Sequence, residues 1–248
     1  TNRKIRKKRA VIKLKFFNTF KNSIPLTIFL EDMTKLKAKS KKRKKNEEIV
    51  NSSSHGIGVL IAVACTAILV TRAAILGNAW HIVTFSIFGA GMINLYTAST
   101  LYHSSRNVKK KLKLNKFDHS SIYVLIAATY TPISLVGLKG AFGWVLFGLI
   151  WAMALCGIAF KVWFYTSKLR TLSTILYIAM GWLVLIAIVP IIRNLPDISL
   201  WFLLAGGLSY SLSTVFYLNR ELPYGHGVFH IFILGGSICH FFSIFFLV

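Results

Sequence analysis

The segment GHGVFHIFILGGSICHFFSIFFLV, residues 225–248, decides the fold class of this chain. From Val228 to Val248 it is mostly apolar, and about 20 such residues span a bilayer as one helix. At its start, His226 and His230 stand four residues apart. One helical turn separates them, so their side chains share a face and can reach one metal ion. The segment therefore predicts a membrane helix with a metal-binding end.

Six further stretches of similar length and composition precede this segment. They are His55–Leu76, His81–Tyr102, Ser120–Leu138, Ala141–Lys161, Thr171–Ile192 and Ser199–Tyr217. The whole chain is 55% apolar with 15% charged residues, and its mean hydropathy is +0.61. Irregular backbone cannot face lipid, which excludes open strands for these stretches. We predict an all-α integral membrane bundle of seven transmembrane helices over residues 47–248, with no soluble domain after residue 50.

Basic residues predict the orientation of this bundle. Of the 30 lysines and arginines, 17 lie within the first 45 residues, and most of the others lie in the loops on the same side. Only Arg72, Lys139 and Arg193 fall in the opposite set of loops. The positive-inside rule then places the N-terminus in the cytoplasm, and seven crossings place Val248 outside. The expected localisation is the cell membrane, with multiple passes.

Residues 1–46 form a basic N-terminal extension ahead of the predicted bundle. The formal net charge of +23 comes largely from this extension, which we expect to be cytoplasmic and poorly ordered. Two interpretations stay open: a solvated tail, or a basic amphipathic segment that contacts the anionic lipids of the inner leaflet. Membrane lipids are the expected partners of the chain, and nucleic acid is not.

Ionisable and polar groups gather at the cytoplasmic end of the predicted bundle. Charged groups cost roughly 2.5–3.5 kcal/mol at the centre of a membrane helix, and they mark functional sites where they occur. The residues concerned lie near the inner ends of four segments: Glu48, Asn51, His55, Ser99, His103, Asp118, His119, His226 and His230. The topology rests on lysines and arginines alone, yet it brings these groups to one face. That agreement predicts a single site.

A third imidazole near His226 and His230 would complete a metal site. His103 closes the second apolar stretch at the same predicted depth. Three protein ligands with an open fourth position are typical of catalytic zinc, whereas structural zinc sites use four. We therefore predict one zinc ion held by His103, His226 and His230. The alternative is a set of interfacial histidines that hydrogen-bond to neighbouring helices.

Asp118 and Ser99 are the predicted catalytic residues beside this metal. Zincin proteases use the glutamate of a His-Glu-x-x-His motif as general base, and here Gly227 occupies that position. Besides Glu48, Asp118 is the only acid near the three histidines in the predicted topology. The Ser99 hydroxyl lies one turn from His103 on the same helix face. The alternatives are a helix N-terminal cap for Asp118 and small-residue packing for Ser99.

Two other histidines are predicted to lie outside the metal site. His240 follows His230 by ten residues, roughly 15 Å along a helix, so it cannot share the same ion. We expect a buried, hydrogen-bonded histidine at that position. His81 belongs to the outer side and is expected at the membrane interface. Pro132 is expected to kink the third membrane helix.

Taken together, these patterns resemble the hemolysin III family, the bacterial branch of the progestin and adipoQ receptors, which include the adiponectin receptors. The resemblance runs from about Glu47 to the C-terminus and leaves out the long basic N-terminus. The patterns that carry it are Glu48-x-x-Asn51-x-x-x-His55, Ser99-x-x-x-His103, Asp118-His119, and His226-x-x-x-His230 with the later His240.

The resemblance implies seven transmembrane helices, a cytoplasmic N-terminus, and zinc held by His103, His226 and His230. It also places Asp118 beside the metal. It further implies kinship with ceramidase-like membrane hydrolases, which use zinc to hydrolyse a lipid amide. The family name comes from a cytolytic phenotype attributed to some bacterial members, and it does not define a mechanism.

Three functions stay open at this point. The first is a zinc-dependent intramembrane hydrolase of lipid amides, in which Asp118 acts as general base and Ser99 positions the water or a developing oxyanion. The second is a cytolytic protein. A secreted pore former usually needs a water-soluble state, and this composition argues against one. The third is a zinc-stabilised receptor or sensor of membrane state without turnover.

Overall fold

The computed structural model describes residues 26–219 and 221–248, and all regular structure in that part of the chain is helical. The chain divides into two compact units, residues 1–46 and 47–248, which are described separately. In the first unit, residues 26–46 are helical. Residues 1–25, which hold much of the basic extension, and Arg220 lie outside the described residues.

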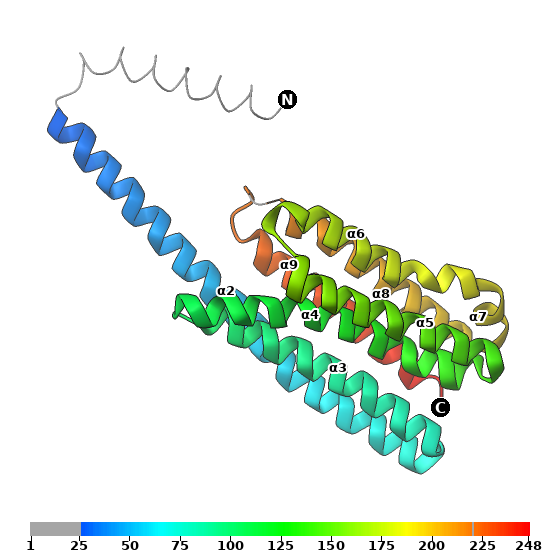
Figure 1. Ribbon diagram of the computed structural model, residues 1–248. Helices are drawn as coiled ribbons and strands as arrows, with labels where there is room; N and C mark the ends of the chain where they lie inside the picture. The colour runs from blue at the N-terminus through cyan, green and yellow to red at the C-terminus, as the bar shows by residue number, and fades with distance from the viewer. Residues whose placement is uncertain (1–25, 220) are drawn as a thin grey trace. The chain divides into compact units, whose positions relative to one another are not determined.

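Seven helical spans are long and apolar enough to cross a membrane: Met33–Leu76, Ala79–Ser104, Val108–Leu138, Gly140–Phe164, Arg170–Asn194, Asp197–Leu218 and Gly225–Phe245. The prediction of an all-α, seven-helix membrane bundle is thereby confirmed. Figure 1 traces these spans through the chain. The α-helices are α2 (Leu26–Leu76), α3 (Ala79–Ser104), α4 (Val108–Pro132), α5 (Gly140–Ala159), α6 (Arg170–Gly181), α7 (Ile188–Asn194), α8 (Asp197–Leu218) and α9 (Gly225–Phe245).

Helix α4 begins well before its apolar stretch. Asn107 caps it, and the Asn107 side chain accepts a hydrogen bond from the backbone N–H of Lys110 at 3.1 Å. Lysine is a good helix former, so the lysine-rich turns extend the helix beyond the apolar residues. Asp118 therefore lies inside α4, more than two turns from its first residue, Val108. The alternative of Asp118 as an N-terminal cap is wrong.

The end of the same membrane span changes its pitch after Pro132. Residues Ile133–Leu138 continue as a π-helix, η1. Proline lacks an N–H and its ring crowds the preceding turn, so it disturbs the regular i to i−4 ladder. The wider turns begin directly after Pro132, and the kink at Pro132 stays a prediction.

The fifth membrane span is broken in its middle. A 3-10 helix, η4 (Trp182–Ala187), separates α6 from α7. The hydroxyl of Tyr130 on α4 donates to the Gly181 carbonyl at 2.8 Å and accepts from the Val184 N–H at 2.7 Å. Backbone groups released by a break inside a membrane need such partners, because lipid supplies none. Tyr130 thus stabilises the irregular turn.

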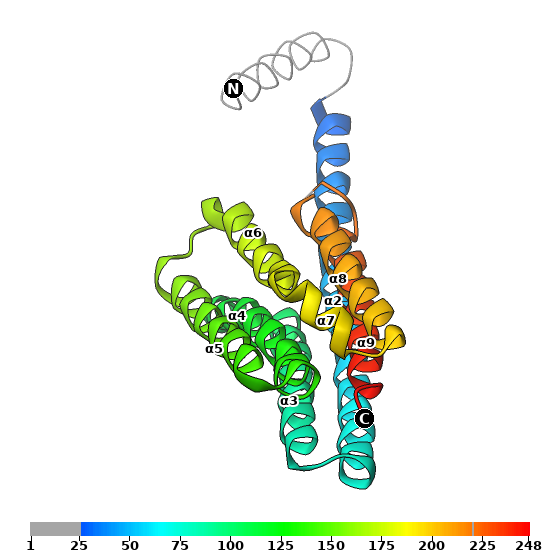
Figure 2. The ribbon, with the colours of Figure 1, turned by 90° about the vertical axis from the view of Figure 1, so that its right-hand side faces the viewer.

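The helices pack as two groups with a broken span between them. In Figure 2, α3, α4 and α5 lie on one side, α8 and α9 on the other, and α6 and α7 run between them. Small residues allow close approach within the groups. A Cβ added to Gly91 on α3 would lie only 2.5 Å from the Cβ of Ala128 on α4.

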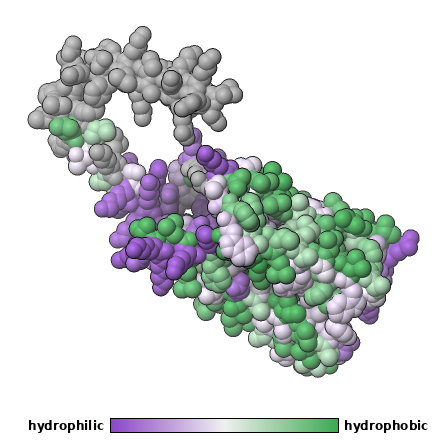
Figure 3. Space-filling view, in the orientation of Figure 1, coloured by the Kyte–Doolittle hydropathy of each residue, from purple (hydrophilic) through white to green (hydrophobic). Residues whose placement is uncertain are grey.

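Apolar side chains cover the outer surface of the bundle as well as its core. Figure 3 shows hydrophobic residues over the lateral surface and hydrophilic ones gathered toward the ends. Leu60, Ile75 and Trp201, for example, are each more than 70% exposed. A soluble protein rarely exposes so large an apolar surface, whereas a bilayer favours it. The surface therefore agrees with the membrane-spanning lengths.

Candidate metal centre

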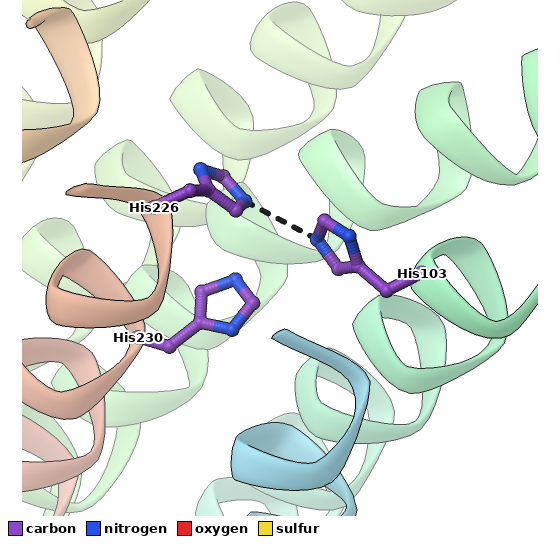
Figure 4. Close-up of side chains that lie close together, drawn as sticks. All are labelled: His103, His226 and His230. Carbon is purple, nitrogen blue, oxygen red and sulfur yellow. Dashed lines mark hydrogen bonds between the residues drawn. The ribbon is translucent and has the colours of Figure 1, made fainter. Parts of the chain in front are cut away.

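Three histidines meet where the end of α3 approaches the start of α9. His226 and His230 occupy the first two turns of α9, which begins at Gly225, and His103 occupies the last turn of α3, which ends at Ser104. Figure 4 shows the two α9 rings turned toward the His103 ring. The structure therefore brings together the three residues that the sequence proposed as ligands.

The spacing of their nitrogens suits a small metal ion. One nitrogen from each of the three rings lies within 4.8 Å of the other two. The Nε2 atoms of His103 and His226 are 3.2 Å apart. Two nitrogens on one tetrahedral zinc, each bonded at 2.0–2.1 Å, would be roughly 3.3–3.4 Å apart. The donor set and its dimensions therefore fit zinc.

The outer nitrogens of two of these rings have partners of their own. The Nδ1 of His103 donates to Glu48 Oε2 at 2.8 Å, and Lys111 holds the other oxygen of Glu48 at 2.8 Å. The Nδ1 of His230 donates to the Asn51 carbonyl at 3.2 Å and lies 3.0 Å from the Ser54 hydroxyl. Such contacts fix the tautomer and orientation of ligand histidines. Both rings thereby direct Nε2 toward the centre of the cluster.

Asp118 and Ser99 border this cluster. Asp118 is buried in the third turn of α4, and Ser99 is buried one turn before His103 on α3. Asp118 lies close to Ser99, His103 and Lys161, and within the described residues the Ser99 hydroxyl has no hydrogen-bond partner. The two predicted catalytic side chains therefore lie beside the three histidines and beside each other.

His55 and His119, whose roles the sequence left unassigned, take different positions. The His55 ring stacks on the His230 ring with centroids 3.6 Å apart, and it is buried. It supports a ligand ring by packing. His119 lies 2.7 Å from the Asn115 carbonyl through Nδ1 and 3.1 Å from the Tyr217 hydroxyl through Nε2. Both of its nitrogens are engaged, which makes His119 a structural residue.

Lys161, the last residue of the fourth predicted membrane stretch, is a buried cation. Its side chain is 1% exposed, and its ammonium donates to the Ser173 hydroxyl at 3.0 Å. The ammonium lies 3.4 Å from the centre of the Tyr165 ring, a cation–π contact. Its interaction with Asp118 makes Lys161 part of the site's electrostatics. The signal was its position inside an apolar stretch, because such cations are rarely left unpaired.

A deep cavity of about 620 Å³ opens from the cluster into the bundle. Asp118, Ser99, His226 and His230 line one end of it. Apolar side chains from α4, α6, α7, α8 and α9 line most of the rest. Such a shape and lining suit a hydrocarbon chain whose polar end lies at the histidines.

The remaining two histidines lie away from the three-histidine group, as predicted. His81 is part of a capping box at the start of α3, where its Nδ1 accepts a hydrogen bond from the Asn78 N–H at 3.3 Å. His240 lies in α9 beyond the cluster and lines the same cavity. Within residues 26–219 and 221–248, the metal-capable group contains only His103, His226 and His230.

Comparison with known proteins gives a consistent result. The family model described as Haemolysin-III related matches residues 43–241. The chain is 46% identical over 200 residues to the Hemolysin-3 homolog of Bacillus subtilis (strain 168), covering 81% of this chain and 93% of that protein. Hemolysin-3 of Bacillus cereus is 43% identical over 202 residues, covering 82% and 92%. The human Monocyte to macrophage differentiation factor is 28% identical over 204 residues, covering 80% and 83%.

Proposed function

The chain belongs to the haemolysin-III related family, and we propose that this multi-pass membrane protein is a zinc-dependent hydrolase of lipid amides. The observation that carries the proposal is the position of the three histidines at the mouth of an apolar cavity, with Asp118 and Ser99 on its wall. His103, His226 and His230 would hold the ion. A set of three protein ligands is typical of catalytic zinc, whereas structural zinc sites use four.

Each side chain of the site has a distinct task in this proposal. Zinc held by the three histidines would supply Lewis-acid chemistry and would lower the pKa of water at the site to about 7. The Asp118 carboxylate accepts a proton from the attacking water and returns it to the leaving amine. The Ser99 hydroxyl donates a hydrogen bond to the oxygen on which negative charge develops. Lys161 supplies positive charge near Asp118. The apolar cavity holds the acyl chain and excludes bulk water.

The proposed orientation places the metal centre at the cytoplasmic side of the cell membrane. The asymmetric distribution of lysines and arginines supports it. A single cysteine introduced at Lys109, near the start of α4, should resist a membrane-impermeant thiol reagent in intact cells and react after permeabilisation. Reaction in intact cells would reverse the topology. In the same orientation, the basic N-terminus contacts the anionic inner leaflet.

The test of the proposed activity is direct. Purified, zinc-loaded protein in lipid nanodiscs is incubated with a panel of lipid amides, and released fatty acid is measured by mass spectrometry. Release should depend on zinc and should be absent from the His226→Ala protein. Bound zinc without release from any amide would instead support the sensor function.

The names of two relatives favour cytolysis as a second candidate. Hemolysin-3 of Bacillus cereus and the Bacillus subtilis homolog both carry that description. Dye-filled liposomes with the inserted protein distinguish the two candidates. Dye release that is equal for the wild type and the His226→Ala protein would favour membrane lysis, because lysis does not require the proposed ion.

A further inference from the structure

The middle of the cavity contains a polar cluster that the proposed chemistry does not use. His240 and Tyr210 line the cavity there, among apolar side chains such as Leu203 and Ile233. His240 lies ten residues beyond His230 on α9, roughly 15 Å along the helix axis. The cluster is therefore too far from the three histidines to take part in their metal binding.

A chain of hydrogen bonds fixes the cluster. The Tyr96 hydroxyl on α3 donates to the Ser237 hydroxyl on α9 at 2.6 Å. The Tyr210 hydroxyl on α8 lies 2.8 Å from the same oxygen. The His240 ring meets the Tyr210 ring edge-on, with centroids 5.1 Å apart. Side chains from three helices thus hold the Tyr210 hydroxyl in a defined position, and the His240 ring packs against the Tyr210 ring.

His240 carries a hydrogen-bonding atom without a partner. The residue is 6% exposed, and within the described residues its Nδ1 has no hydrogen-bond partner. The ring also contacts the backbone of Leu203. Nδ1 still has no hydrogen-bond partner. Buried polar atoms are nearly always hydrogen-bonded, so each exception calls for a ligand or another explanation. His240 lines the cavity through other atoms of its ring, while Nδ1 itself is closed off, so a molecule inside the cavity can supply the missing partner once the ring turns about its own axis.

Two glycines leave room for the rings of this cluster. A Cβ at Gly206 would lie 2.4 Å from His240 Nε2, and a Cβ at Gly236 would lie 2.3 Å from Tyr210 Cε1. No side chain tolerates such distances without moving the ring. The sequence therefore keeps both rings close against the facing helix backbone, which makes the cluster a built feature of the cavity.

We propose that His240 and Tyr210 form a second binding subsite, which recognises a hydroxyl group carried partway along the hydrocarbon chain of the ligand. A hydroxyl both donates and accepts. It can therefore pair with Nδ1 of His240 in either tautomer and with the oxygen of Tyr210. A charged group at this depth would be costly. The inference rests on the proposed function in one respect, namely that a lipid chain occupies the cavity with its head at the histidines.

Fatty acids test this subsite without requiring turnover. The full-length, zinc-loaded protein is titrated with stearic acid and with hydroxystearic acids whose hydroxyl moves along successive chain positions. Displacement of a fluorescent fatty acid gives each affinity. We expect an optimum for a mid-chain hydroxyl, roughly 2- to 10-fold tighter than stearic acid, the size expected of one net hydrogen bond. Equal affinity across the series, or binding of no fatty acid at all, would overturn the subsite.

Variants locate the optimum within the structure. The double variant His240→Leu with Tyr210→Phe should flatten the series, and His240→Gln should keep part of the preference. Thr129→Val is the matched control, because Thr129 lines the cavity but its hydroxyl already donates to the Leu125 carbonyl at 2.8 Å. An optimum that survives the double variant would contradict the assignment.

The outcomes for the subsite and for the proposed hydrolase can be told apart. A mid-chain optimum without hydrolysis of any amide would leave the subsite standing and remove the proposed activity. Hydrolysis combined with a flat series would do the reverse.

Discussion

The near and deep parts of α9 hold histidines in opposite circumstances. At the near end, the outer nitrogen of His230 is fixed by the Asn51 carbonyl, and its other edge faces His103 and His226. Deeper in the same helix, Nδ1 of His240 has no hydrogen-bond partner among the described residues, and the ring faces an apolar cavity. The comparison separates two histidines of one helix by the partners of their nitrogens. We propose that this difference prepares His230 to bind a metal and His240 to bind a neutral ligand.

The largest expected effect is on the zinc content of two variants, one at His226 in the three-histidine cluster and one at His240 deeper in α9. His226→Ala removes one of three nitrogen ligands, and the protein should lose most of its bound zinc. His240→Ala, on the same helix, should retain the wild-type amount. Elemental analysis of purified protein gives the zinc-to-protein ratio. Equal zinc in the wild type and the His226→Ala protein would end the assignment of the three-histidine cluster.

A second prediction sharpens the division of tasks at the near end. Asp118→Asn keeps the size of the side chain but removes the proton acceptor. The rate at which the protein hydrolyses a lipid amide should fall by roughly 10²–10⁴-fold, the usual contribution of a general base to the rate. The zinc content should stay normal. Asp197→Asn is the matched control, because Asp197 lines the same cavity at the start of α8. Normal turnover by the Asp118→Asn protein would leave Asp118 without a chemical role.

The sequence predicted well that His103, His226 and His230 meet, because the signals for this cluster lie in short stretches of sequence. The spacing of His226 and His230 depends only on helical geometry, and His103 follows from loop charges that set which helix ends meet. The lysine-rich start of α4 was harder, because an apolar pattern marks the membrane span and not the helix end. Asn107 was the available signal for the true start of that helix.

The cluster of His240 and Tyr210 and the electrostatics of the metal site could not be predicted, because both depend on packing between helices. The Tyr96–Ser237–Tyr210 network joins three helices whose mutual rotation the sequence does not encode in any short motif. The same is true of Lys161, whose partner Ser173 lies on another helix. The break between α6 and α7 likewise depends on a hydroxyl from α4, that of Tyr130.

A third prediction tests whether the partner of His103 prepares it for metal. Glu48→Gln keeps an oxygen near His103 Nδ1 but removes the charge that orients the ring and attracts Lys111. Zinc affinity should fall by roughly 10- to 100-fold, the range for loss of such a partner. Competition with a chromophoric chelator measures the affinity. Glu221→Gln, in the exposed loop before α9, should change nothing, and an equal loss in both variants would indicate a general charge effect.

The smallest expected effect concerns the space beside the His240 ring. Alanine substitutions at two neighbouring glycines on α8, Gly206 and Gly207, test it. Overpacking by the Gly206→Ala methyl, which would lie 2.4 Å from the His240 ring, costs about 1–3 kcal/mol. The better helix propensity of alanine returns about 0.5–1 kcal/mol. Gly207→Ala gains the same propensity, but its methyl meets only Trp182, at 3.8 Å. Thermal unfolding in detergent should therefore show a lower Tm for Gly206→Ala and an unchanged or higher Tm for Gly207→Ala. Equal changes of Tm in both proteins would mean that the His240 ring moves aside without cost. The His240 and Tyr210 cluster would then lack the fixed geometry that distinguishes it from the rest of the cavity wall.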